Sequence, residues 1–173
     1  MRRNGLVGLA TVVFATIVVT GQAPPRVPAG PTVTDSLAAV FALAGGAVTD
    51  VNGDGLADSV MARIVVPARA TAEDIEAATN IAGRLGYETT SLTLPLVLRD
   101  TEVDPAKVPL PILVGRQNSL VLHLAERGAI DLKALTPGQG LVALVASAIG
   151  GRPAIVVAGG DDAGTLAAGT QLA

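Results

Sequence analysis

Hydrophobic and polar residues follow patterns along the chain whose period changes from one segment to the next. Segment 59–66 is rich in β-branched apolar residues and ends at a proline, which predicts a strand. Segment 71–86 carries apolar residues at helical spacing, and Thr71 and Asp74 stand where a capping box would place them. Segment 87–98 alternates threonine with leucine and predicts a second strand, interrupted by a proline. This order predicts a βαβ-like unit with parallel pairing.

The last third of the chain shows the same alternation with shorter segments. A buried strand is predicted at 112–115, followed by a helix that Asn118 or Ser119 caps. Two apolar runs at 141–146 and 154–158 flank a pair of glycines and predict an antiparallel hairpin. An alanine-rich helix follows this hairpin and is still running at the last residue.

Together these elements predict an α/β fold, with α+β as the alternative. The expected architecture is a mixed sheet that contains the βαβ-like unit and a C-terminal hairpin leading into a helix. One domain is expected at 35–173, since about 100 to 200 residues usually form one domain. It would open with a short apolar helix at 37–43. Because the last helix has no cap, we expect a truncated domain or the first module of a longer protein.

The amino terminus has the pattern of an export signal. Arg2 and Arg3 precede an apolar run at 5–20, which is shorter than the roughly 20 residues of a membrane-spanning helix. We therefore predict a signal peptide at 1–21 and a proline-rich linker at 22–34. The mature protein is expected to be secreted or periplasmic, with no membrane contact after signal cleavage.

Composition narrows the source of stability and the class of partner. Half of the residues (50%) are hydrophobic but only 2% are aromatic, so the core must be aliphatic. The chain has no cysteine, so its core is stable alone or with a bound metal ion, without disulfides. The net charge of −3 and the pI near 5.0 exclude nucleic acid as a partner, because phosphate binding needs clustered Lys and Arg.

The clearest chemical motif lies before the first predicted strand. Side chains with oxygen atoms occupy positions 1, 3, 5 and 9 of an EF-hand-like loop, with glycine at position 6 and a main-chain carbonyl available at position 7. The predicted Ca²⁺ ligands are Asp50, Asn52, Asp54, Leu56 and Asp58. Position 12 is Met61 instead of a bidentate glutamate, and no entering helix is evident. The alternative is a polar turn whose side chains bond their own backbone.

Other polar residues favour structural roles over chemistry. Asp161 and Asp162 follow two glycines, and we interpret them as helix caps because two carboxylates would repel a phosphate. Arg116, at another strand-to-helix junction, can grip a carboxylate or sugar hydroxyls but is interpreted as a solvated arginine. The single His123 has no second histidine or cysteine and is interpreted as a packed or half-exposed structural residue. No nucleophile motif occurs, so no catalytic residue is nominated and catalytic activity in this chain is not expected.

A distant resemblance concerns residues 111–173. Gly138 and Gly140, the predicted hairpin, and the Gly160–Thr165 turn before an alanine-rich helix resemble the small α/β domain preceding the catalytic barrel in β-hexosaminidase-like and α-glucuronidase-like glycoside hydrolases. Similar modules occur in periplasmic cellulose synthase subunits and archaeal surface-layer proteins. In the hydrolases this domain is an accessory, so the resemblance implies a carbohydrate-associated context without activity.

These observations predict an exported, non-catalytic α/β module of an envelope or carbohydrate-active protein, stabilised by one Ca²⁺ ion. Its expected partners are other domains of a longer chain or envelope proteins. A glycan is a further candidate, but not by aromatic stacking, since only one tyrosine and no tryptophan are present. A calcium-dependent cell-surface or adhesion protein is the alternative function. The N-terminal piece of a secreted hydrolase is the third.

Overall fold

The fold is that of a computed structural model, which describes residues 37–104 and 107–173. The predicted signal peptide (1–21) and proline-rich linker (22–34) lie outside the described residues. The strands are β1 (Val48–Thr49), β2 (Ser59–Val60), β3 (Ala62–Val66), β4 (Val97–Arg99), β5 (Leu110–Val114), β6 (Gly140–Ile149) and β7 (Arg152–Gly159). The helices are α1 (Ala72–Tyr87), α2 (Ser119–Glu126) and α3 (Asp162–Leu172), and a short 3₁₀ helix covers Leu37–Ala39.

A mixed five-stranded sheet organises the domain, with strand order β4-β3-β5-β7-β6. Strands β4, β3, β5 and β7 are parallel, and β6 runs antiparallel to β7. A separate two-stranded sheet pairs β1 with β2. The βαβ unit is β3-α1-β4, and the C-terminal hairpin β6-β7 leads into α3. The predicted mixed α/β sheet with a hairpin leading into a helix is therefore confirmed.

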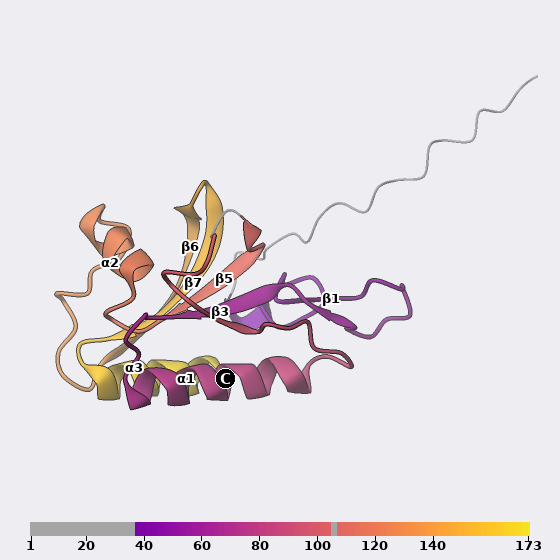
Figure 1. The fold of residues 1–173 in the computed structure, drawn as a ribbon, viewed down its shortest axis with the longest axis horizontal. Coiled ribbons are helices and arrows are strands. Elements are labelled where there is room, and N and C mark those ends of the chain that lie inside the picture. Colours follow the sequence, from indigo (N-terminus) through magenta and orange to yellow (C-terminus); the bar gives the residue numbers. More distant parts are fainter. Residues whose placement is uncertain (1–36, 105–106) are drawn as a thin grey trace, which may run out of the picture.

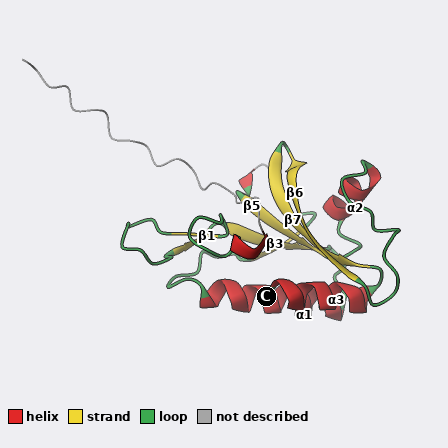
Figure 2. Ribbon diagram, turned by 180° about the vertical axis from the view of Figure 1, so that it is seen from behind, coloured by secondary structure: helices red, strands yellow, loops and turns green. Residues whose placement is uncertain are grey.

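Helices cover both faces of the five-stranded sheet (Figure 1). Helices α1 and α3 lie side by side on one face, as the view from behind also shows (Figure 2). Helix α2 lies on the other face. Parallel strands that are covered on both faces need continuous apolar runs, and all five residues of β5 are indeed buried.

The core is aliphatic apart from Phe41 and forms one layer on each side of the sheet. Successive strand residues point to opposite faces, so Ile64 packs toward α1 while Val65 packs toward α2. The same alternation places Ile155 and Val156 in different layers. Tyr87, at the end of α1, is 83% exposed and adds nothing to either layer.

Helix α1 confirms the predicted capping box. The Thr71 side chain accepts a hydrogen bond from the Asp74 amide at 3.2 Å, and the Asp74 carboxylate accepts one from the Thr71 amide at 3.0 Å. These bonds satisfy two of the amides that a helix start leaves without a partner. The helix continues through Gly86 to Tyr87, one residue past the predicted end.

The predicted strand at 59–66 is two strands that belong to different sheets. The break falls at Met61, because the amides of Met61 and Ala62 both donate to the Ala47 carbonyl oxygen, at 2.9 and 3.1 Å. This contact turns the chain from β2 into β3. The predicted helix at 37–43 is likewise only a 3₁₀ turn, whose Val40 carbonyl accepts from the Ala47 amide instead of continuing a helix.

The predicted strand at 87–98 is wrong over most of its length, since only β4 at its end pairs with the sheet. Thr90 donates its amide to the Ala57 carbonyl at 2.8 Å, and the Thr89 hydroxyl donates to the same oxygen at 3.2 Å. These threonines therefore fasten the segment to the β1-β2 region. Strand β5 begins at Leu110, two residues before the strand predicted at 112–115.

Candidate functional site

The predicted calcium loop joins β1 to β2 at the end of the molecule opposite α2 (Figure 1). Its base is closed by the Asp58 amide, which donates to the Thr49 carbonyl at 3.0 Å. The Asp58 carboxylate closes it a second time by accepting from the Val51 amide at 2.8 Å. The short hairpin therefore holds the first and last predicted ligands at neighbouring points of the loop.

Within this loop the side-chain oxygens turn toward the backbone. The two oxygens of Asp50 accept from the amides of Gly53 and Gly55, at 2.6 and 2.7 Å. Both glycines have positive φ, 79° and 90°, which explains their presence in so tight a loop. The hydrogen bond from the Gly55 amide is the main cause that holds the pKa of Asp50 below its usual value. The Asp50 carboxylate thus orders the loop by accepting from two of its amides.

Asn52 and Asp54 continue the same arrangement. Asn52 Oδ1 accepts from the Asp54 amide and Asp54 Oδ1 accepts from the Leu56 amide, each at 2.9 Å. The Asn52 side-chain amide donates to Asp54 Oδ2 at 3.1 Å. A carboxylate or carbonyl oxygen has two lone pairs, so one amide contact leaves each oxygen able to accept again. These bonds agree with the polar-turn alternative and leave the Ca²⁺ prediction open.

The donor set is suited to a hard cation only as a whole. Across residues 37–104 and 107–173, no three His, Cys, Asp or Glu side chains are grouped so that they could hold a metal ion by themselves. A cation in this loop would therefore also need the Asn52 amide oxygen and the Leu56 carbonyl. Ca²⁺ accepts such mixed sets of carboxylate, amide and main-chain oxygens.

A second polar cluster lies where the parallel strands end. Asn118 is fully buried and donates from its side chain to the carbonyls of Val65, at 2.8 Å, and Val114, at 3.3 Å. Its Oδ1 accepts from the Leu120 amide at 3.0 Å, so Asn118 is the N-cap of α2 as predicted. One side chain thus joins the ends of β3 and β5 to the start of α2.

Asp161 and Arg116 fasten the end of β7. Asp161 Oδ1 accepts from the amides of Gly138, at 2.9 Å, and Gly164, at 2.8 Å. These two bonds, the Gly138 one first, hold the pKa of Asp161 below its usual value. The interpretation of Asp161 as a helix cap is confirmed. Arg116, interpreted as a solvated arginine, is half-buried and its guanidinium donates to the Gly160 carbonyl.

Asp74 is buried against a glycine, an arrangement that the sequence pattern did not predict. Asp74 is 2% exposed, and its Oδ1 has no hydrogen-bond partner in the described part of the chain. A Cβ on Gly115, whose φ is +95°, would lie 2.7 Å from that oxygen and 2.9 Å from Pro67 Cγ. Burial is the main cause that raises the pKa of Asp74. The only signal in the sequence was a glycine directly after a buried strand.

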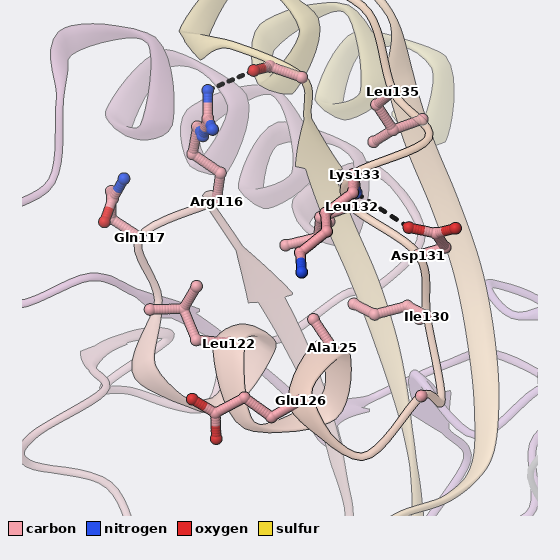
Figure 3. A pocket seen from close by; sticks show the side chains of 12 residues that line it. Arg116, Gln117, Leu122, Ala125, Glu126, Ile130, Asp131, Leu132, Lys133 and Leu135 are labelled. Atoms are coloured by element: carbon pink, nitrogen blue, oxygen red, sulfur yellow. Dashed lines mark hydrogen bonds between the residues drawn. The ribbon is translucent and has the colours of Figure 1, made fainter.

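A cavity of about 820 Å³ lies between α2 and the segment that leads to β6 (Figure 3). Leu122, Ala125 and Ile130 give it an apolar floor, while its charged residues are two cations, including Lys133, and two anions, including Asp131. The Asp131 carboxylate accepts from the Lys133 amide at 2.9 Å. Because the cavity is lined by equal numbers of cationic and anionic residues, its charge favours neither an anionic nor a cationic ligand. His123 is exposed on α2 and does not line this cavity.

Comparison with protein families finds a match for the C-terminal half of the chain. Residues 87–173 match the family described as the S-layer like family, outer domain. The chain belongs to this S-layer like family. The matched region covers β4 through α3, including the whole β6-β7 hairpin. No curated protein matches the chain.

The S-layer like match assigns this region to a different family from the one that the sequence resemblance suggested. It contains all of 111–173, the part that resembles the accessory domain of β-hexosaminidase-like hydrolases, but assigns it to a surface-layer family. A surface-layer type of accessory domain is therefore correct, and the relationship to the hydrolases is not. The calcium loop lies outside the matched region, so the family makes no statement about it.

Membership in the S-layer like family gives location and partners in broad terms. A domain of this family belongs at the cell surface or outside the cell, and it associates with other domains or with components of the cell envelope. The expected envelope module is therefore confirmed at this level. As for the membrane, none of the helices within the described residues has the length and apolar character to cross one.

Proposed function

We propose that the protein is an exported, non-catalytic structural module of a cell-surface layer, secreted after removal of residues 1–21 and stabilised by one Ca²⁺ ion in loop 50–58. The S-layer like match over 87–173 carries the first part of this proposal. The export pattern at the amino terminus supports it independently, because the match does not include it.

The calcium part of the proposal is supported by the loop itself. Four side chains with oxygen atoms stand in the sequence at positions 1, 3, 5 and 9 of a calcium loop, and both oxygens of Asp50 accept hydrogen bonds from amides of that loop. Outside the cell, calcium sites of low affinity are still occupied, because their dissociation constants of about 0.1 to 1 mM are close to the extracellular Ca²⁺ concentration. The ion would brace the end of the domain that is formed by the two-stranded β1-β2 sheet.

Thermal melting with and without Ca²⁺ tests this site. With a dissociation constant of about 1 mM, roughly 10 mM Ca²⁺ should raise Tm by about 5 °C. Asp54→Ala should abolish this rise, because it removes a ligand carboxylate. Glu76→Ala removes the same charge from the exposed face of α1 and should keep the full rise. If the wild type shows no Ca²⁺-dependent shift, the loop is only a turn.

The location is tested on intact cells of the source organism with a membrane-impermeant amine reagent. We expect the mature chain, which would begin at Gln22, to be labelled without cell lysis and to lack residues 1–21 in mass spectrometry. A cytoplasmic protein of the same cells is the control for leakage. An unprocessed chain that is labelled only after lysis would contradict export.

A further inference from the structure

Strand β6 forms one edge of the five-stranded sheet, and its composition is unusual for an edge. Its ten residues, Gly140–Ile149, contain no charged residue and no proline. The five central residues, 141–145, are apolar and half-buried, although β6 has a neighbour on one side only. Natural sheets commonly protect an edge of this kind with charges, proline or a covering segment, since it is a template for another strand.

The hydrogen-bond register shows which main-chain groups face outward. The Gly160 amide donates to the Gln139 carbonyl at 2.9 Å, which makes 139 and 160 a hydrogen-bonded pair of the β6-β7 ladder. Bonded and non-bonded pairs alternate in antiparallel ladders, so Val142 and Leu144 turn their amides and carbonyls away from β7. The Val157 carbonyl, opposite Val142, accordingly accepts from Gly115 of β5.

The outward groups of β6 stay free over a defined length. The amides and carbonyls of Val142 and Leu144 have no partner among the described residues. Beyond them the register shifts after Val145, and the Arg127 guanidinium donates to the Ala148 carbonyl at 2.7 Å. The open part of the edge thus includes 141–145, which is the length of an ordinary strand.

The opposite edge of the sheet is protected. Strand β4 has only three residues, follows Pro95 closely, and ends in Arg99, which pairs with Glu102 at 3.5 Å. These are the devices that keep edges from pairing. The two edges of one sheet therefore differ in chemistry, and only β6 is built to accept a further strand.

Space for the side chains of an added strand exists on both faces of β6. A depression of about 500 Å³ borders Ala143 and Val145 on the α2 face. Another, of about 400 Å³, lies beside Val142 on the α1 and α3 face and includes Phe41 and Leu172. Since successive residues of a strand point to opposite faces, one added strand would fill both depressions.

A second copy of the same strand fits this edge better than the undescribed amino-terminal segment. Two antiparallel β6 strands related by a two-fold axis present the same outward amides and carbonyls to each other. No charge would be buried between them, because β6 has none. The linker at 22–34 contains four prolines, none of which can donate to a ladder.

We propose that two copies of this protein associate edge to edge through β6, forming a continuous ten-stranded sheet with both α1-α3 layers on the same face. The inference deepens the proposed surface-layer function by naming a partner, a second copy, and the strand that holds it. It does not depend on the calcium loop, which lies on a different sheet.

Sedimentation of the chain that begins at Gln22, from micromolar to submillimolar concentration, tests this pairing. The wild type should pass from monomer to dimer, and Val142→Pro should weaken dimerisation by about tenfold or more, because each dimer loses two amide donors. Val97→Pro is the matched control, since Val97 also turns its amide outward, on the β4 edge. It should dimerise like the wild type.

Three results would overturn the proposal: a wild type that stays monomeric, a folded Val142→Pro variant that dimerises like the wild type, or equal loss in Val97→Pro. If Val142→Pro does not fold, cross-linking of a single introduced cysteine tests the pairing instead. The wild-type chain has no cysteine, so only the introduced one can react. Ala143→Cys should be cross-linked between copies by a short bismaleimide, and Val97→Cys should not. A monomer found on the cell surface would contradict this pairing while leaving the proposed location intact.

Discussion

Replacing Gly164 with alanine is expected to lower the free energy of unfolding by about 3 kcal/mol. Gly164 lies in the first turn of α3, where its backbone packs closely against Gln139, the residue before β6. A Cβ at this position would overlap the main-chain carbonyl oxygen of Gln139 and lie 3.2 Å from Asp161 Oδ1. Main chain cannot rotate out of the way as a flexible side chain can, so α3 or the start of β6 must shift.

Urea denaturation measures this loss, with Gly83→Ala as the matched control. Gly83 lies inside α1, and a Cβ there meets nothing within 4 Å. The same added methyl group should therefore raise stability by about 0.5 to 1 kcal/mol, since alanine favours the helix. Equal effects of the two substitutions would show that the close packing of α3 on β6 is not what Gly164 provides.

Asn118→Ala should cost about 3 kcal/mol, the second large effect. The substitution removes the side-chain partner of the buried carbonyls of Val65 and Val114 and of the part-buried amide of Leu120. A buried polar group that loses its partner costs about 1 to 3 kcal/mol, and the three groups share one side chain. Both strand ends and the start of α2 should therefore loosen together.

The control for Asn118 is Asn80→Ala, measured in the same denaturation series. Asn80 makes one long hydrogen bond, from its side-chain amide to Thr170 Oγ1 at 3.4 Å, at the surface between α1 and α3. Its replacement should stay within about 0.5 kcal/mol of the wild type. Amide hydrogen exchange should become faster at the start of α2 in Asn118→Ala alone. Unchanged exchange there would show that the Asn118 side chain does not hold the start of α2 to the strand ends.

Local signals predicted the three α-helices, because helix starts depend on residues two to four positions apart. Thr71 with Asp74, Asn118 and Asp161 all cap the helices that the sequence assigned to them. The strand at 87–98 failed because its threonines bond to Ala57, more than thirty residues earlier. The pattern of threonine and leucine alone cannot show such a contact, so tertiary hydrogen bonding overrode local preference.

The candidate sites divide in the same way. The loop at 50–58 was visible in the sequence because all its polar partners lie within nine residues. The contact of Arg116 with Gly160 joins residues 44 positions apart, and the burial of Asp74 against Gly115 depends on two strand-to-helix turns. The edge character of β6 also needed the strand order, since the hairpin pattern is the same for an edge and for a central strand.

The order of the central strands has a consequence for how the chain folds. Strand β3 pairs with β5, and β5 with β7, and each pairing joins residues that are about 40 to 50 positions apart in the sequence. Contacts between residues so far apart in the sequence form slowly, because the chain loses the entropy of a long loop before the paired strands gain their contacts. During synthesis, β5 emerges about 40 residues before β7, so one of its two pairing sides stays open until β7 has been made.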